Sequence, residues 1–292
     1  MSAELIEGEP VAERIKEEVK DAVEKMSAPP KLVSVLATDN PGAKFYAKSQ
    51  GKACGEVGIE YELHGPDEIG DRTDTEGLKD YIRGLNKDGT VTGILQLMPL
   101  PEGVDQRAVQ LEMAPEKDVE GVHPANIGRL FYGDFSLSPC TAHAVIAMLD
   151  DFGVDMEGKE TVVIGHSEIV GKPAVVMLLR SMMHSPTVSC CHIATKDLQF
   201  HTKRAEVLIV AAGKAGLVNG DMLKENSVVI DVGINRIKVE EEGKKKTKVV
   251  GDVDFDSAGE VAAAITPVPG GVGLVTTAML LKNTVECARR QK

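Results

Sequence analysis

The sequence lacks the cysteine pattern of a disulfide-bonded or zinc-binding protein. Its 292 residues include five cysteines, an odd number, and none of them forms a C-x-x-C pair. Disulfide frameworks and structural zinc sites need paired, regularly spaced cysteines, so we expect reduced thiols that mostly serve packing. The histidines at positions 123, 143, 166 and 192 are too scattered for a ligand set. We therefore predict no metal site.

An excess of positive charge and long apolar runs are also lacking. The formal net charge is −12 at pH 7, which repels phosphate polymers and anionic lipid, so we expect neither nucleic acid nor membrane as a partner. The first ten residues contain three glutamates and no apolar run, and no later segment is long and uncharged enough to span a bilayer. We expect a cytoplasmic protein without a secretory signal.

The content of 42% hydrophobic and 27% charged residues suits one large core or two ordinary ones, and two domains are the better expectation. Val11, Ile15, Val19 and Val23 recur every four residues, which predicts an amphipathic helix ending before Pro29-Pro30. The segments that follow alternate between strand-like and helix-like patterns. The predicted strands are 31–38, 59–64 and 93–98, and the predicted helices are 43–57 and 75–87.

A helix over 142–152 leads to a second series of Val/Ile-rich runs with little alternation, as expected of parallel strands covered on both faces. These predicted strands are 161–165, 187–192, 207–211, 228–232 and 263–267, and a helix over 275–290 closes the chain. The glutamates and lysines of Val239–Lys248 surround Gly243 and predict a solvated hairpin. The pattern indicates an α/β protein with two doubly wound, mainly parallel sheets.

The segment Gly165–Pro173 follows a predicted strand and opens an apolar helix. A Rossmann unit presents backbone N–H groups and a positive helix end to a pyrophosphate at this place, although G-x-G-x-x-G is missing and a plain βα turn is the alternative. The motif G-x-S-x-x-V-G-x-P resembles the phosphate loop of the methylenetetrahydrofolate dehydrogenase/cyclohydrolase family. Further segments similar to that family, in the same order, are Tyr46, Pro139–Thr141, Val229–Asn235, Val250–Val253 and Ile265–Gly273.

The resemblance implies a folate domain, 1–142 plus 273–292, and a Rossmann-type NAD(P)-binding domain, 143–272, with folate in the cleft between them and a homodimer formed through the second domain. It implies hydride transfer from the methylene group of a tetrahydrofolate derivative to NAD or NADP. The expected cofactor residues are Gly165, His166, Ser167, Ile169, Val170, His192, Ile193, Ala212, Gly213, Gly233, Ile234 and Thr276. The expected substrate residues are Tyr46, Leu97, Pro99, Glu120, Pro269, Gly270 and Gly271, with Tyr46, Gln50 and Glu120 as catalytic candidates.

Three positions depart from the family pattern. The family carries a lysine four residues after the tyrosine, where this chain has Gln50; it carries a glutamine before the Pro-Leu-Pro turn, where this chain has Leu97; and it carries an aspartate where this chain has Glu120. Lys48 and Lys52 point away from the face shared by residues four apart. Gln96 is one residue out of place, on the opposite face of a strand unless a bulge compensates. We therefore expect the cyclohydrolase activity to be weak or absent, with Lys48 or Lys52 swinging in as the alternative.

Other interpretations stay open. Tyr46 could be a core aromatic, Glu120 a surface acid, and the proline-glycine segment a structural turn, although tyrosine is rare in this chain. The chain could be fully bifunctional, act on a modified pterin or another N-methylene adduct, or be a catalytically silent dinucleotide-binding paralogue. Ile193 offers neither charge nor donor to a 2′-phosphate, which favours NAD, whereas Lys196 or His166 reaching that phosphate would favour NADP.

Overall fold

The structure is a computed structural model that describes residues 2–241 and 244–291, and it divides into two compact units. One unit comprises the chain up to Ala12 and Thr141–Thr276, and we call it the six-stranded unit after its sheet. The other comprises Glu13–Cys140 and the chain from Thr277 onward, and we call it the three-stranded unit. Each is described by itself.

The three-stranded unit is a parallel sheet with β2 (Lys31–Val35) in the centre, flanked by β3 (Glu60–His64) and β4 (Gly93–Gln96). The strands are joined by helices, as parallel neighbours require. The remaining elements of this unit are α3 (Pro66–Ile69), α5 (Gln106–Glu112), the 3₁₀ turn η1 (Pro115–Lys117) and α6 (Pro124–Phe131), besides α2 (Pro41–Glu56) and α4 (Thr75–Lys87).

Helices cover both faces of this sheet. Val33, Val35 and Ile94 point to one face and share a buried core with residues of α4 and α5. The other face carries Ser34, which contacts Gln50 of α2. Much of α1 (Gly8–Glu24) and of α11 (Val272–Arg290) also belongs to this unit, where Lys282 pairs with Glu18 at 3.3 Å.

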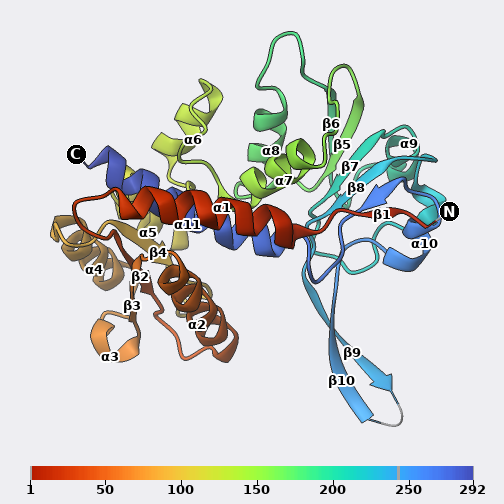
Figure 1. The fold of residues 1–292 in the computed structure, drawn as a ribbon. Helices are drawn as coiled ribbons and strands as arrows, with labels where there is room; N and C mark the ends of the chain where they lie inside the picture. The colour runs from red at the N-terminus through yellow and green to blue at the C-terminus, as the bar shows by residue number, and fades with distance from the viewer. Residues whose placement is uncertain (1, 242–243, 292) are drawn as a thin grey trace. The chain divides into compact units, whose positions relative to one another are not determined.

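The six-stranded unit has a parallel sheet in the order β1-β11-β8-β7-β5-β6 (Figure 1). The chain runs from β5 to β6 on one side and returns to β7 on the other, so the strand order reverses between β5 and β7. Ligands of doubly wound folds bind outside the carboxyl ends of the strands at such a reversal. The strands are β1 (Glu4–Leu5), β5 (Glu160–Ile164), β6 (Thr187–Cys191), β7 (Val207–Val210), β8 (Val228–Asp231) and β11 (Ala264–Ile265). The helical elements are α7 (Cys140–Asp151), α8 (Gly171–Leu178), α9 (Leu198–Thr202), η2 (Gly220–Met222) and α10 (Phe255–Gly259).

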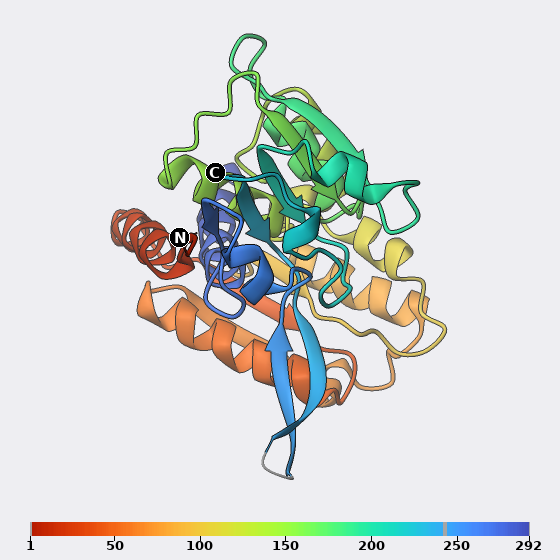
Figure 2. The same cartoon turned by 90° about the vertical axis from the view of Figure 1, so that its right-hand side faces the viewer.

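The predicted α/β class is confirmed, and so is the hairpin. β9 (Asn235–Glu241) and β10 (Lys244–Val250) pair in antiparallel fashion, and Figures 1 and 2 show this arm extending away from the six-stranded sheet. Gly243 of the predicted turn lies outside the described residues.

The N-terminal segment is the part of the fold that differs from the sequence-based domain limits. The sequence assigned residues 1–142 to the first domain, whereas the segment up to Ala12 makes its contacts in the six-stranded unit. The reason is that β1 pairs with β11, and the backbone N–H of Ile6 donates to the carbonyl of Ile265 at 2.9 Å. Two paired residues are too few to show a hydrophobic period.

Within the described ranges 2–241 and 244–291, no helix is both long and apolar enough to cross a membrane.

Two glycines of the three-stranded unit should respond oppositely to alanine. A Cβ on Gly93 of β4 would lie 2.3 Å from Cγ1 of Val119, so Gly93→Ala must displace a buried side chain and should lower the free energy of unfolding by about 1–3 kcal/mol. Gly84 of α4 is exposed and has open space around its Cα, so Gly84→Ala should raise that free energy by about 0.5–1 kcal/mol. Urea denaturation measures both, and equal effects of the two substitutions would contradict this packing.

Candidate active site

Most of the expected cofactor residues gather at the carboxyl edge of the six-stranded sheet. Gly165 and His166 directly follow β5, His192 and Ile193 follow β6, Ala212 and Gly213 follow β7, and Gly233 and Ile234 follow β8. The imidazoles of His166 and His192 meet edge to face with centroids 5.1 Å apart, which joins the first two loops. Ile169, Ile193 and Ile234 are 53%, 65% and 65% exposed, unusual for isoleucine and suited to contact with a flat ligand.

The loop after β5 fits a dinucleotide phosphate. Gly165 has φ of +113°, and a Cβ there would lie 2.1 Å from the carbonyl oxygen of Ala211, so only glycine allows this approach of the β5 and β7 ends. Ser167 Oγ accepts from the N–H of Val170 at 3.1 Å and shapes the turn into α8. The helix N-terminus therefore opens at the reversal of strand order, where backbone N–H groups and the helix dipole favour a pyrophosphate.

Two buried aspartates hold the neighbouring loops, and the sequence analysis assigned neither of them. Asp252 Oδ2 accepts from the N–H groups of Ala212 at 2.6 Å and Gly213 at 2.8 Å, and Oδ1 accepts from Asn235 Nδ2. Asp231 Oδ1 accepts from the N–H groups of Gly233 and Asp252. Burial raises the pKa of Asp231 to about 6, and these donors act against that shift. Asp231 ends the parallel strand β8, which was a usable signal because ligands of doubly wound folds bind at the carboxyl ends of the strands. Asp252 follows the antiparallel hairpin strand β10 and gave no such signal.

The proline-glycine segment and Thr276 also belong to the six-stranded unit. Pro269 is exposed, Gly271 is buried, and the carbonyl of Gly270 accepts from the N–H of Gly8 at 2.8 Å. Thr276, near the start of α11, donates from Oγ1 to the carbonyl of Val272. The segment is thus fixed by backbone contacts of its own unit.

In the three-stranded unit, Gln50 lies on the buried face of α2. It is 1% exposed, and its Oε1 accepts from Ser34 Oγ at 3.5 Å. Among residues 2–241 and 244–291, its Nε2 has no aligned hydrogen-bond partner. The position four residues after Tyr46 therefore holds a buried neutral amide whose donor has only the Tyr46 hydroxyl near it, without an aligned hydrogen bond.

Tyr46, one turn earlier on α2, remains 43% exposed. Burial raises the pKa of its hydroxyl to about 12, while Gln50 lies close enough to lower it by hydrogen bonding and Glu120 raises it by repulsion. The ring thus offers an open face for stacking, and its hydroxyl stays protonated at neutral pH.

The β2–β4 register decides where the displaced glutamine points. Ser34 pairs with Leu95 and Val35 with Gln96, and the N–H of Leu97 continues the ladder to the carbonyl of Val35 at 2.9 Å. The ladder runs residue by residue, so Leu97 shares the Ser34 face and Gln96 the opposite one. No compensating bulge interrupts the described strand Gly93–Gln96. Pro99 follows in an exposed turn, where its carbonyl accepts from Thr38 Oγ1.

The neighbouring lysines point elsewhere. Lys48 is exposed, and the side chain of Lys52 is 82% exposed and lies 3.7 Å from Glu56. Lys117 is buried, but its Nζ donates to the carbonyls of Leu85 and Asp88. Lys52 and Lys117 therefore have partners other than Gln50, and Lys48 is on the exposed part of α2.

Glu120 is positioned by a tightly bonded segment. Asp118, two residues earlier, bridges to Ile94 beside β4, and its Oδ2 accepts from the N–H of His123 and from Asn126 Nδ2. Asn283 Nδ2 donates to the carbonyl of Val119 at 2.8 Å. Among the described residues no Lys or Arg pairs with Glu120. Burial, and to a smaller extent repulsion from Asp118, raises the pKa of Glu120 to about 8. Such a carboxyl is largely protonated at neutral pH.

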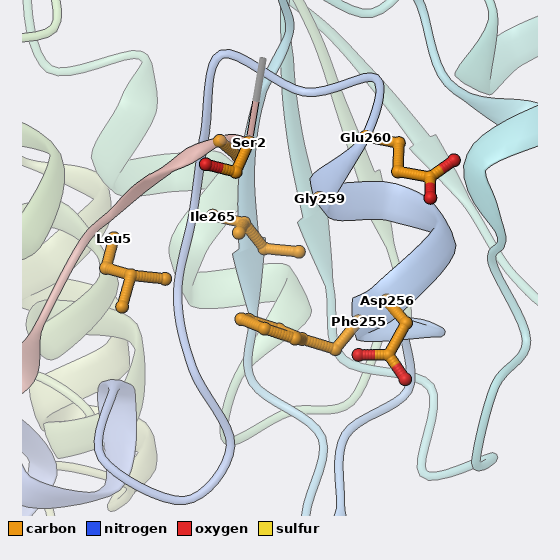
Figure 3. Close-up of a pocket in the computed structure, with 8 residues that line it drawn as sticks. Ser2, Leu5, Phe255, Asp256, Gly259, Glu260 and Ile265 are labelled. Atoms are coloured by element: carbon orange, nitrogen blue, oxygen red, sulfur yellow. The ribbon is translucent and has the colours of Figure 1, made fainter.

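Two further observations bear on ligands. A hollow of about 640 Å³ in the six-stranded unit is lined by Leu5, Phe255 and Ile265 together with the acids Asp256 and Glu260 (Figure 3). These residues differ from those expected to bind substrate or cofactor. Within residues 2–241 and 244–291, no group of three or more His, Cys, Asp or Glu side chains is arranged to hold a metal ion.

Comparison with known proteins agrees with this geometry. Residues 139–292 match the model of the tetrahydrofolate dehydrogenase/cyclohydrolase NAD(P)-binding domain, and residues 6–120 match that of the catalytic domain of the same family. The chain belongs to the tetrahydrofolate dehydrogenase/cyclohydrolase family. The bifunctional protein FolD of Moorella thermoacetica is 45% identical over 293 residues, covering 99% of this chain and 100% of that protein.

Solved structures of the family have the same fold. The bifunctional enzyme FolD of Campylobacter jejuni is 40% identical, with a TM-score of 0.89 and full coverage of both chains. The Trypanosoma brucei FolD, described as complexed with NADP cofactor and inhibitor, is 32% identical with a TM-score of 0.89, covering 99% of this chain and 98% of that chain. Thr141–Thr276, the main part of the six-stranded unit with the loop after β5, lies within the match to the NAD(P)-binding domain.

The raised pKa of Glu120 predicts a pH dependence of stability. Its pKa is about 8 in the folded chain against a usual value of 4.5, so folding favours the protonated form and this contribution is lost as the pH rises from about 4.5 through 8. Glu120→Gln cannot ionise. We expect the variant and the wild type to melt at similar temperatures at pH 5, and the variant to melt at a higher temperature at pH 9.

The matched control is Glu116→Gln, which alters an exposed acid of the same segment and should follow the wild-type profile. A melting-temperature difference for Glu120→Gln that stays constant from pH 5 to pH 9 would show that Glu120 does not titrate in this range.

Proposed function

We propose that this protein is an NAD(P)-dependent methylenetetrahydrofolate dehydrogenase in which cyclohydrolase activity is weak or absent. The observation that carries the proposal is the buried neutral amide of Gln50 at the family's lysine position, next to a stacking tyrosine and a carboxyl group that are both retained. Family membership supports the dehydrogenase, and the phosphate-fitting loop after β5 supports the dinucleotide.

Hydride transfer depends mainly on holding two flat rings at near-attack distance. Tyr46 presents an open ring face to the pterin, and Glu120 presents a carboxyl group to its amide and amine edge. Gly165, Ser167 and the start of α8 would hold the pyrophosphate of NAD(P), which supplies the hydride acceptor when bound. Asp252 would keep the Ala212–Gly213 loop in place beside it.

Hydrolysis of the methenyl product needs a further group that activates water and moves a proton. The family resemblance assigns this task to the lysine supported by the glutamine. Gln50 is neutral at every accessible pH, and Leu97 occupies the sheet face where the supporting amide is needed. A positioned acid or base contributes about two to four decades of rate, and its loss leaves the methenyl cation as the product released.

The proposal predicts the outcome of a direct hydrolysis assay. With purified wild-type protein, the absorbance of methenyltetrahydrofolate should fall at close to the rate of spontaneous hydrolysis in buffer alone. Gln50→Lys combined with Leu97→Gln restores an ammonium and an amide on one face, and should raise the rate by about tenfold or more over wild type. Wild-type turnover of several per second would contradict the proposal.

Lys48→Gln and Lys52→Gln are the matched controls for this assay. Both side chains are exposed on the outer side of α2, so neither substitution should change the hydrolysis rate. If the wild type hydrolyses faster than buffer and one of these variants does not, that lysine takes the place of the family lysine, as in the alternative interpretation.

We further propose that NAD is preferred over NADP. Ile193 follows β6, where relatives that use NADP place a group for the 2′-phosphate, and its 65% exposed side chain has neither charge nor donor. We expect a higher kcat/KM with NAD and a shift toward NADP in Ile193→Ser. Ile234→Ser, equally exposed at the end of β8, should affect both cofactors alike. A wild-type efficiency about tenfold better with NADP would overturn the preference, with His166 or Lys196 as the groups responsible.

Reduction of NAD or NADP by methylenetetrahydrofolate, followed by absorbance, tests the activity itself. Failure of that reaction would favour a modified pterin, another N-methylene adduct or a silent paralogue.

We also propose that the protein is a homodimer formed through the six-stranded unit. Sedimentation as a monomer at micromolar concentration would reject this proposal.

A further inference from the structure

Ser34 is an unusual residue for its position. It lies in the middle of β2, the central strand, and is 0% exposed, between the buried apolar neighbours Val33 and Val35. A buried hydroxyl is costly unless it is hydrogen-bonded. Within the described part of the chain, its hydrogen bond is to Gln50 Oε1 at 3.5 Å.

A second buried hydroxyl lies next to this pair. Tyr61 of β3 pairs in register with Leu32, so it projects to the same sheet face as Ser34, and its ring packs against Gly51 of α2. Ser34 lies close enough to lower the pKa of Tyr61 by hydrogen bonding, against the raising effect of burial. Yet the Tyr61 hydroxyl has no aligned partner among residues 2–241 and 244–291.

We propose that Ser34 is a positioning residue of the substrate site, which fixes the Gln50 amide by donating to Oε1 so that Nε2 is offered to an acceptor atom of the folate. This inference rests on the proposed function. The serine hydroxyl has one proton, and giving it to Oε1 turns the other end of the amide, Nε2, away from the sheet.

The geometry explains why Gln50 carries an unpaired donor. The amide is 1% exposed, and its N–H₂ has no aligned partner and only the Tyr46 hydroxyl near it. Such a group is destabilising until a better acceptor is supplied, and binding sites commonly retain such groups for recognition. Gln50 is one helical turn from Tyr46, so the donor lies beside the ring on which the pterin would stack. The chain therefore replaces an ammonium with an oriented neutral donor, built from residues of both β2 and α2.

A double-mutant cycle tests this role. Dissociation constants for tetrahydrofolate and the kcat/KM of methylenetetrahydrofolate oxidation are measured for the wild type, Ser34→Ala, Gln50→Ala and the double variant. If Ser34 acts through Gln50, each single substitution weakens both quantities by about tenfold, and Ser34→Ala has no further effect in the Gln50→Ala background. Independent, additive losses would overturn the proposal, since a merely structural Ser34 would act in either background.

Tyr61→Phe is the matched control. It removes the hydroxyl that lies next to Ser34 and leaves both partners of the Ser34–Gln50 contact in place, so binding and activity should stay within about twofold of wild type. A loss equal to that of Ser34→Ala would assign the positioning to Tyr61 and overturn the proposal. If Ser34→Ala does not fold, Ser34→Cys, a weaker donor, enters the same cycle and should show a smaller loss that again disappears with Gln50→Ala.

The two proposals fail in distinguishable ways. Wild-type protein that binds tetrahydrofolate but does not reduce NAD or NADP refutes the dehydrogenase, while the cycle measured by binding still decides the role of Ser34. Wild-type protein that is active but shows additive losses refutes the positioning alone. Protein that neither binds nor oxidises folate refutes both.

Discussion

The buried amide of Gln50 is the feature on which the proposed function depends. A group on the inner face of α2 is enclosed by the helix and the sheet, so its charge and its hydrogen bonds decide what the site can hold. An ammonium there would be a proton donor of adjustable pKa. The amide keeps a donor and removes the charge, and in the proposed function it contributes by positioning the substrate.

The alternation of side chains along β4 reinforces that outcome. Because the pairing with β2 is regular, moving a glutamine by one residue transfers it to the face packed by α4 and α5 and leaves Leu97 on the face of Ser34. Gln96 is 8% exposed there, and its Oε1 lacks a partner in the described chain. Two independent elements, a helix and a strand, thus carry neutral or apolar side chains where the proposed function requires that no group moves a proton.

Much of the fold could be predicted from the sequence because its periods are strong. The four-residue repeat of Val11, Ile15, Val19 and Val23 corresponds to α1, and the predicted helix 75–87 corresponds to α4. The short elements β1, α6 and α10 escaped because so few residues show no clear period. Their place depends on tertiary contacts, as the pairing of β1 with β11 shows.

The candidate site was predictable where motifs fix the backbone, and less so where a side chain acts through another. The loop after β5 and the departures at Gln50, Leu97 and Glu120 could all be identified from spacing together with the family resemblance. Ser34 looks like a small residue in an apolar strand, and Asp252 looks like one acid among 45 Asp and Glu residues. Only the contacts to Gln50 and to the Ala212–Gly213 loop distinguish them.

The most direct test of this account is the ratio of methenyltetrahydrofolate accumulated to NAD(P) reduced during oxidation of methylenetetrahydrofolate by the wild-type enzyme. The absorption bands of the two products overlap, so samples taken along the time course are separated by chromatography and each product is quantified by itself. The account predicts a ratio close to one throughout, after correction for spontaneous hydrolysis, because the site passes on a hydride but does not activate water. Reduced cofactor that accumulates while methenyltetrahydrofolate stays near zero would contradict it.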